Sequence, residues 1–263
     1  MFTNKSIELY KDLLKFSESI KDEYLKNVPT FENQLTFWDI NAECYLKMYE
    51  NIPSKEDIVE TSVLFKEIEW LKELYNKASA FYLKKRNESI KWLDVQLWKQ
   101  FENAFMAFLN SIWITALRWD LENRKLPDVM VLDKTRNIKA HIELKYHNAP
   151  FILAKKMINR EPYEWSITLD FDKVQRQLIE IRSELERPVF FVHRVDFPDL
   201  KWIFFNTDEQ IDNYLNADDT DIFEREWREW DYNMVKKIGY TKKFYPPLHE
   251  MWDFEELINI LKS

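Results

Sequence analysis

Glycine occurs only once in this chain of 263 residues, at Gly239, and this near-absence limits what the chain can fold into. A G-x-G-x-x-G dinucleotide turn and a G-x-x-x-x-G-K-[ST] phosphate loop both need glycine where the backbone approaches phosphate closely. The nucleophile elbow G-x-S-x-G needs glycine to relieve a strained turn. Dinucleotide oxidoreductases, P-loop NTPases and α/β-hydrolases are therefore poor candidates for this chain.

The rest of the composition sets milder limits. Aromatic residues make up 16% of the chain, including 11 tryptophans, so a sizeable core is available. A formal net charge of −8 argues against a passive nucleic-acid coat but leaves room for a local basic cleft. The single cysteine, Cys44, cannot form an internal disulfide, and no long apolar stretch stands out. We expect a soluble, cytoplasmic protein that does not enter a membrane.

Hydrophobic periodicity divides the chain into three regions. We expect a helical N-terminal region over residues 1–87, an α/β core over 88–206 and a helical C-terminal extension over 207–263 packed on the core. The predicted core order is helix, three strands, helix and two strands. The expected ranges are 90–109 for the first helix, 111–119, 128–133 and 138–146 for the strands, 170–186 for the second helix, and 189–195 and 202–205 for the last strands. Residues 111–119 also allow an extension of the first helix.

The two strands over 128–133 and 138–146 predict a hairpin. If residues 134–137 form its loop, Asp133 lies opposite Ile138, and the same register places Asp128 opposite Glu143. Opposite residues of an antiparallel pair lie on one face with Cβ atoms roughly 4.5–5.5 Å apart. Two carboxylates held so closely repel each other, and a divalent cation such as Mg²⁺ would compensate. Lys145 shares the face of Glu143 and could reach the same phosphate or orient an attacking water.

Pro127-Asp128 followed by Glu143-Leu144-Lys145 resembles the PD-(D/E)xK motif of the restriction-endonuclease-like nucleases. In that family a helix with a glutamate precedes a three-stranded meander, which a helix and further strands follow, and the order over 88–206 agrees. The resemblance implies an α/β fold with a mixed sheet flanked by helices. It also implies that Asp128 and Glu143 bind Mg²⁺ or Mn²⁺ with help from the Leu144 carbonyl, and that Lys145 positions water or stabilises the developing charge.

Further residues take supporting positions in this resemblance. Glu102 lies on the apolar side of its predicted helix, where a carboxylate is unwelcome, and would complete a second metal position or hold metal-bound water. Gln175 and Gln177 lie on the predicted helix after the motif, where many members place a glutamine. Lys155, Lys156 and Arg160 follow the motif and could line a groove for the DNA backbone.

Histidine and cysteine do not suggest another metal centre. His141 shares the polar face with Glu143 and could contact metal, water or DNA, although such a residue is more often a partly exposed strand histidine. His147, His193 and His249 are scattered, and no zinc-ligand spacing exists.

These observations favour a metal-dependent endodeoxyribonuclease that hydrolyses DNA phosphodiester bonds in restriction or phage-related defence. The N-terminal helices would supply DNA contacts, target choice or formation of a homodimer. Two alternatives stay open. The negative net charge and the helical flanks also fit a nuclease-derived DNA-binding or regulatory subunit that does not cleave. An RNA-cleaving endonuclease like those of viral cap-snatching would share the site, although no better-placed metal histidine stands out for it.

Overall fold

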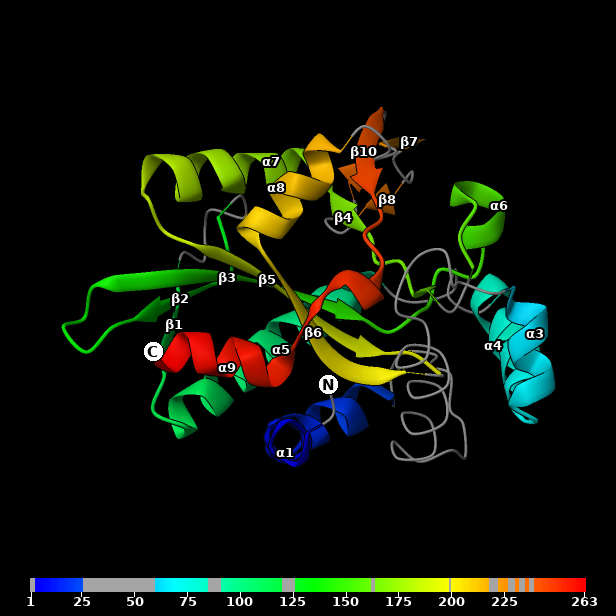
Figure 1. Ribbon diagram of the computed structural model, residues 1–263, viewed down its shortest axis with the longest axis horizontal. Coiled ribbons are helices and arrows are strands. Elements are labelled where there is room, and N and C mark those ends of the chain that lie inside the picture. The colour runs from blue at the N-terminus through cyan, green and yellow to red at the C-terminus, as the bar shows by residue number, and fades with distance from the viewer. Residues whose placement is uncertain are drawn as a thin grey trace.

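The computed structural model describes residues 3–25, 60–84, 91–119, 126–161, 164–198, 200–217, 222–226, 230–231, 235–236 and 239–263. A six-stranded mixed sheet in the order β1-β2-β3-β5-β6-β11 forms its centre (Figure 1). Neighbouring strands are antiparallel except for β3 and β5, which are parallel. The strands are β1 (Thr115–Arg118), β2 (Val129–Leu132), β3 (Ile138–His147), β5 (Val189–Asp196), β6 (Lys201–Thr207) and β11 (Trp252–Asp253).

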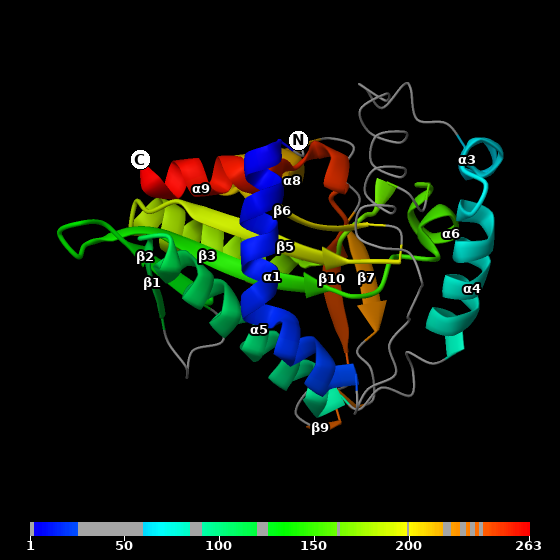
Figure 2. The ribbon, with the colours of Figure 1, turned by 90° about the horizontal axis from the view of Figure 1, so that it is seen from below.

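Helices cover both faces of this sheet. One face carries α1 (Asn4–Leu25), α5 (Lys91–Ser111) and α9 (Phe254–Lys262), and Figure 2 shows α1 crossing the strands beside α5. The other face carries α7 (Phe171–Gln177), which continues into a π-helical segment over Leu178–Glu184, and α8 (Asp208–Asn216). Because the central parallel pair is covered on both sides, β5 is buried over almost its whole length.

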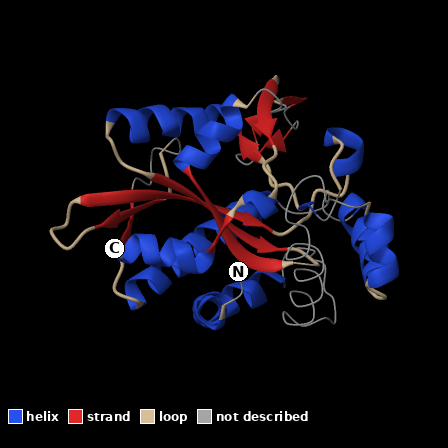
Figure 3. Cartoon of the chain, in the orientation of Figure 1, coloured by secondary structure: helices blue, strands red, loops and turns tan. Residues whose placement is uncertain are grey.

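Smaller elements complete the fold (Figure 3). A three-stranded sheet in the order β4-β10-β7 lies beside the start of α7, and β8 pairs with β9. The remaining elements are α3 (Thr61–Glu67), α4 (Leu71–Lys84), α6 (Ala154–Ile158), β4 (Leu169–Asp170), β7 (Phe223–Glu226), β8 (Trp230–Asp231), β9 (Val235–Lys236), β10 (Tyr240–Phe244) and a 3₁₀ turn (Leu248–Glu250). Within the described ranges, none of the helices combines the length and apolar character needed to cross a bilayer.

The predicted core order is confirmed. The elements α5, β1, β2, β3, α7, β5 and β6 follow the expected helix, three strands, helix and two strands, with the short, unpredicted α6 and β4 between β3 and α7. The uncertain stretch 111–119 is divided: α5 ends at Ser111, and the strand begins at Thr115. Asn110 fixes this change, because its side chain donates to the Ala116 carbonyl at 2.9 Å and accepts from the Ala116 N–H at 3.1 Å.

The predictions for the flanking regions are partly right. α1, α3 and α4 are helices, and α1 packs on α5 and α9, so this part of the N-terminal region shares the main core. The prediction that 207–263 is helical is wrong between α8 and α9, where β7, β8, β9, β10 and β11 lie. The first four residues of β10, Y-T-K-K, alternate between exposed and partly buried, a strand pattern that the surrounding acidic sequence conceals. Cys44 lies outside the described residues, and the division at residues 87 and 206 stays a prediction.

The scarcity of glycine has a visible consequence in the backbone. Several non-glycine residues hold the left-handed conformation that glycine adopts without steric cost. They are Trp113 (φ 68°), Arg136 (φ 67°), Asn159 (φ 50°), Trp165 (φ 44°) and Glu186 (φ 51°). At these positions the chain therefore adopts a backbone conformation that the Cβ atom disfavours sterically.

We predict that Arg136→Gly stabilises the protein by about 1 kcal/mol. A left-handed L-residue costs roughly 1–2 kcal/mol, and the larger conformational entropy that glycine loses on folding offsets part of this gain. Arg136 is exposed in the hairpin loop, so the substitution removes little packing. Urea unfolding of both proteins measures the difference. Lys134→Gly, an exposed neighbour without a positive φ, is the control and should not stabilise. A loss of stability in Arg136→Gly would contradict the strain.

Candidate active site

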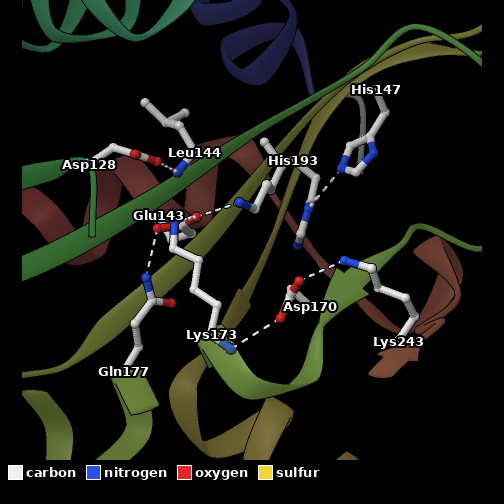
Figure 4. Close-up of polar contacts among 10 residues, drawn as sticks. Asp128, Glu143, Leu144, His147, Asp170, Lys173, Gln177, His193 and Lys243 are labelled. Carbon is white, nitrogen blue, oxygen red and sulfur yellow. Dashed lines mark hydrogen bonds and ion pairs between the residues drawn. The ribbon is translucent and has the colours of Figure 1, made fainter. Parts of the chain in front are cut away.

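The hairpin holds the two predicted metal ligands next to each other. Val129 lies opposite Ile142, and continuing this register by one residue places Asp128 opposite Glu143. The Asp128 carboxylate accepts a hydrogen bond from the Leu144 N–H at 2.8 Å (Figure 4). The side chain of Asp128 therefore occupies the position on the β3 edge where β2 no longer pairs.

The loop end of the hairpin differs from the prediction. Asp133 does not lie opposite Ile138; its N–H donates to the Asn137 carbonyl at 2.9 Å, and Leu132 pairs with Ile138. The Asp133 carboxylate accepts from the Asn137 N–H at 2.9 Å and draws the loop tight. A β-bulge between Val131 and Leu132 adds one residue on β3, which restores the register expected at the site end.

Glu143 is the most enclosed member of the site, with an exposed fraction of 1%. One carboxylate oxygen pairs with the ammonium groups of Lys145 and Lys173, the latter at 2.5 Å. The other oxygen accepts from the Gln177 amide at 2.7 Å (Figure 4). A buried carboxylate is tolerated only when it is paired and hydrogen-bonded in this way.

Helix α7 supplies two of these three partners. Lys173 and Gln177 are four residues apart and therefore lie on one face of the helix. Asp170 caps the helix by accepting from the Lys173 N–H at 3.2 Å. Its carboxylate also pairs with Lys243 of β10 at 2.6 Å, so the small sheet holds the start of α7 over the site (Figure 4).

The two carboxyl groups are electrostatically different. Burial, followed by the negative charge of Glu143, raises the pKa of the Asp128 carboxyl to about 7. Burial also pushes the pKa of Glu143 upward, but Lys145 and Lys173 outweigh it and hold that pKa below its usual range. Glu143 therefore stays ionised, whereas Asp128 exchanges its proton near neutral pH when no further cation is near.

The donor set fits a divalent metal ion. Among the described residues no three acidic, histidine or cysteine side chains gather in a metal-binding cluster, so the candidates are Asp128 and Glu143 with main-chain oxygen. The N–H and C=O of a strand residue point to the same edge, so the Leu144 carbonyl lies on the edge where its N–H meets Asp128. Mg²⁺ typically takes one or two carboxylates and completes its shell with water and phosphate oxygens.

Glu102 of α5 comes to the Asp128 side of the site. Its negative charge contributes to the raised pKa of Asp128. Its own carboxylate pairs with the guanidinium of Arg118 on β1, which also donates to Asn103 at 2.9 Å. The structure thus explains how an acidic side chain is accommodated against this helix face.

The other predicted residues separate into one that reaches the site and several that do not. Gln177 contacts Glu143, whereas Gln175 is exposed on the same helix. Lys155 pairs with Glu161 at 2.6 Å, and Lys156 is exposed. The guanidinium of Arg160 donates to Tyr214 Oη at 2.8 Å and to the Tyr245 carbonyl, which connects the segment after α6 to α8 and to the end of β10. Nucleic-acid contacts by Gln175, Lys155, Lys156 and Arg160 stay predictions.

The expectation for His141 is wrong. Its side chain is fully buried, not partly exposed, and its ring stacks on Trp119 with centroids 4.0 Å apart. Burial lowers the pKa of His141 to about 4. The cause is the central position of β3: both of its faces are covered at this point, so the predicted polar face does not meet solvent.

Several residues at the site are not predicted from the sequence. Lys173, Asp170 and Lys243 belong to the network around Glu143, and His193 accepts or donates a bond with His147 at 3.2 Å. The spacing of four between Lys173 and Gln177 was the available signal. Nothing in the local sequence of β10 indicates that Lys243 would meet Asp170.

We predict that Gln177→Leu destabilises the protein by about 1–2 kcal/mol, because Glu143 loses a buried partner for one charged oxygen. Removing the buried, unbonded Gln177 Oε1 is favourable, but losing the hydrogen bond to the charged Glu143 oxygen costs more. Gln175→Leu, exposed on the same helix, is the matched control and should change stability little. Chemical unfolding of the three proteins compares them, and equal effects of both substitutions would refute the role of Gln177.

Asp128 should also impose a pH dependence on stability. Its folded-state pKa of about 7 exceeds the ordinary value of 3.8, so the unfolded chain releases this proton first as the pH rises. The Asp128 contribution is therefore present at low pH and is lost between about pH 4 and pH 7. We predict that metal-free Asp128→Asn gains stability over wild type across this window, by on the order of 1–3 kcal/mol.

Thermal unfolding in EDTA at a series of pH values measures this gain. Asp133→Asn is the control, because bonds from Thr135 and Asn137 hold the pKa of that exposed carboxyl below its usual range. It should give no gain as the pH rises. A difference between wild type and Asp128→Asn that does not vary with pH would contradict the raised pKa.

Comparison with known proteins gives little sequence similarity. No protein-family model matches the chain, and no curated protein matches it. Among solved structures it is similar to Hjc, a Holliday junction resolvase from the archaeal hyperthermophile Archaeoglobus fulgidus. The identity is 13%, the match covers 62% of this chain and 95% of Hjc, and the TM-score is 0.36. We therefore base the function on the geometry of the site.

Proposed function

We propose that this chain is a metal-dependent endodeoxyribonuclease that hydrolyses phosphodiester bonds of DNA. The observation that carries the proposal is the juxtaposition of Asp128 and Glu143 on a hairpin, with Lys145 bonded to Glu143. A chain with one glycine cannot hold phosphate with a glycine-rich loop, and this arrangement needs none.

Asp128, Glu143 and the Leu144 carbonyl would hold Mg²⁺ or Mn²⁺. The bound ion would polarise the phosphate and lower the pKa of a water molecule, which is the chemistry that hydrolysis of a phosphodiester requires. The raised pKa of Asp128 supports this assignment, because a carboxyl group that repels its neighbour is relieved by a cation between them.

The remaining residues hold the reacting groups in place. Lys145 would orient the attacking water or stabilise the charge that develops on the phosphate. Lys173 and Gln177 keep the Glu143 carboxylate in one orientation. Glu102, anchored by Arg118, would hold water bound to the metal. Hydrolysis would leave a 5′-phosphate and a 3′-hydroxyl.

We extend the proposal to the setting that the motif resemblance implies, restriction or phage-related defence. The N-terminal helices would contribute DNA contacts, target choice or a homodimer interface. Lys155, Lys156, Arg160 and Gln175 are our candidates for contacts with DNA away from the scissile bond.

The test compares wild type with Glu143→Gln on plasmid and single-stranded DNA in Mg²⁺ or Mn²⁺. We expect wild type to nick or cut DNA and Glu143→Gln to lose on the order of 10²–10³-fold in rate, as when one transition-state contact is removed. Glu184→Gln, exposed at the end of the π-helical segment, is the matched control and should retain full activity. Gel electrophoresis of the products measures the cleavage rate.

The outcomes separate the candidate functions. Equal cleavage by wild type and Glu143→Gln would reject the assigned site. Cleavage of RNA in preference to DNA would identify the RNA-cleaving alternative. Binding of DNA without cleavage under any of these conditions would identify a non-cleaving, nuclease-derived subunit, and calorimetry with Mn²⁺ would then show whether the carboxylates hold metal.

A further inference from the structure

A cleft lies beside the candidate active site, on the side of β3 that faces α5. It shares Leu144 and Lys145 with the site, and α5 contributes Glu102 and aromatic side chains to its wall. The residues that matter for its chemistry are Phe101, Glu102, Leu144, Lys145, Tyr146 and Arg194. The cleft therefore borders the candidate site at Leu144 and Lys145, whereas the Glu143 carboxylate lies on the other face of the sheet, against α7.

Arg194 is a buried cation in this cleft. Its exposed fraction is 7%, and among the described residues its guanidinium has no carboxylate within ion-pair distance. The Nε donor is buried without an acceptor. Asp196, two residues further along β5, is engaged by Lys201 at 2.5 Å and by the Tyr146 hydroxyl at 3.0 Å.

Aromatic rings hold the guanidinium in position. Its Cζ atom lies 4.1 Å from the centroid of the Phe101 ring and 5.9 Å from that of Tyr146, and these two rings stack at 4.3 Å. Such contacts use the flat face of the guanidinium, whereas its N–H donors point outward in its plane. The rings therefore fix the orientation of Arg194 and leave donors for a planar, bidentate acceptor.

We propose that Arg194 binds a phosphate of the DNA backbone adjacent to the scissile phosphate. This inference rests on the proposed function, and it assigns a contact that the PD-(D/E)xK motif does not contain. A buried cation without an anion is costly, and a phosphate that enters the cleft would supply the missing charge and accept two parallel hydrogen bonds. Glu102, the acidic residue of the cleft, does not compete, because Arg118 neutralises it.

The register of the strands supports an adjacent phosphate as the ligand. Lys145 lies opposite His193 and Tyr146 lies opposite Arg194 in the parallel pair of β3 and β5. Neighbouring strands are about 4.8 Å apart, so Lys145 and Arg194 arise from adjoining positions. Because side chains alternate along a strand and Arg194 follows His193, the two cations point to opposite faces of the sheet. A nucleic-acid strand that passes the free edge of β3 near Leu144 would meet Lys145 on one face of the sheet and Arg194 on the other.

The test measures binding of a fluorescein-labelled DNA duplex by fluorescence anisotropy in EDTA, where cleavage cannot occur. We expect Arg194→Met to weaken binding roughly tenfold or more, and to reduce the magnitude of the slope of log affinity against log salt concentration by about 1. Arg187→Met removes the same charge from an exposed position and is the control; it should change the affinity much less.

A stability measurement distinguishes a ligand-binding role from a structural one. Without DNA, Arg194→Met should melt at the same or a higher temperature than wild type, because it removes an unpaired buried charge and keeps an apolar stem. Added DNA should raise the melting temperature of wild type more than that of Arg194→Met. A structural arginine would give the opposite result, a lower melting temperature without DNA.

The outcomes keep this inference separate from the proposed activity. If wild type and Arg194→Met bind DNA with equal affinity and equal salt dependence, the inference is overturned and the nuclease proposal stands. If wild type binds DNA through Arg194 but does not cleave it, the inference stands and the nuclease proposal fails. A marked loss of stability in metal-free, DNA-free Arg194→Met would also overturn the inference.

Discussion

The buried carboxylate of Glu143 is the group on which the arrangement of the site depends. Removing this charge from water is costly, so two ammonium groups and one amide surround it. Two of these partners come from α7, which requires the helix to lie on this face of the sheet in one orientation. The Asp170 cap and the Lys243 ion pair then fix the start of α7. One buried charge thus connects the central strand, the covering helix and the small sheet.

The ionisation of the polar side chains on the central strands depends on the groups that cover them. On the α7 face Glu143 is ionised because lysines are near, whereas His193 is fully buried with its pKa far below the usual range, chiefly because of burial. His141 is also buried and stacks on Trp119. The same sheet therefore holds a charged carboxylate and neutral imidazoles a few residues apart, and the difference lies in the partners that each side chain receives.

The sequence was sufficient for the features that depend on local pattern. Strand alternation and loop length were enough to place Asp128 opposite Glu143, although the loop was misjudged by one residue and a bulge compensated for it. Contacts made by docking of distant elements were not predictable: Lys173 meets Glu143 only because α7 packs on β3. The strands after α8 were missed for the same reason, since β10 is stabilised by pairing with β4 and β7.

Two groups at the site are left without full compensation, and their ionised forms carry opposite charges. The Asp128 carboxyl is raised in pKa beside Glu143, and the guanidinium of Arg194 has no carboxylate partner within the described residues. A protein that only needed stability would gain by replacing either one. A metal ion would satisfy the first and a phosphate the second. A metal-bound nucleic-acid backbone supplies both at once, so the same ligand that the proposed reaction requires would relieve both costs.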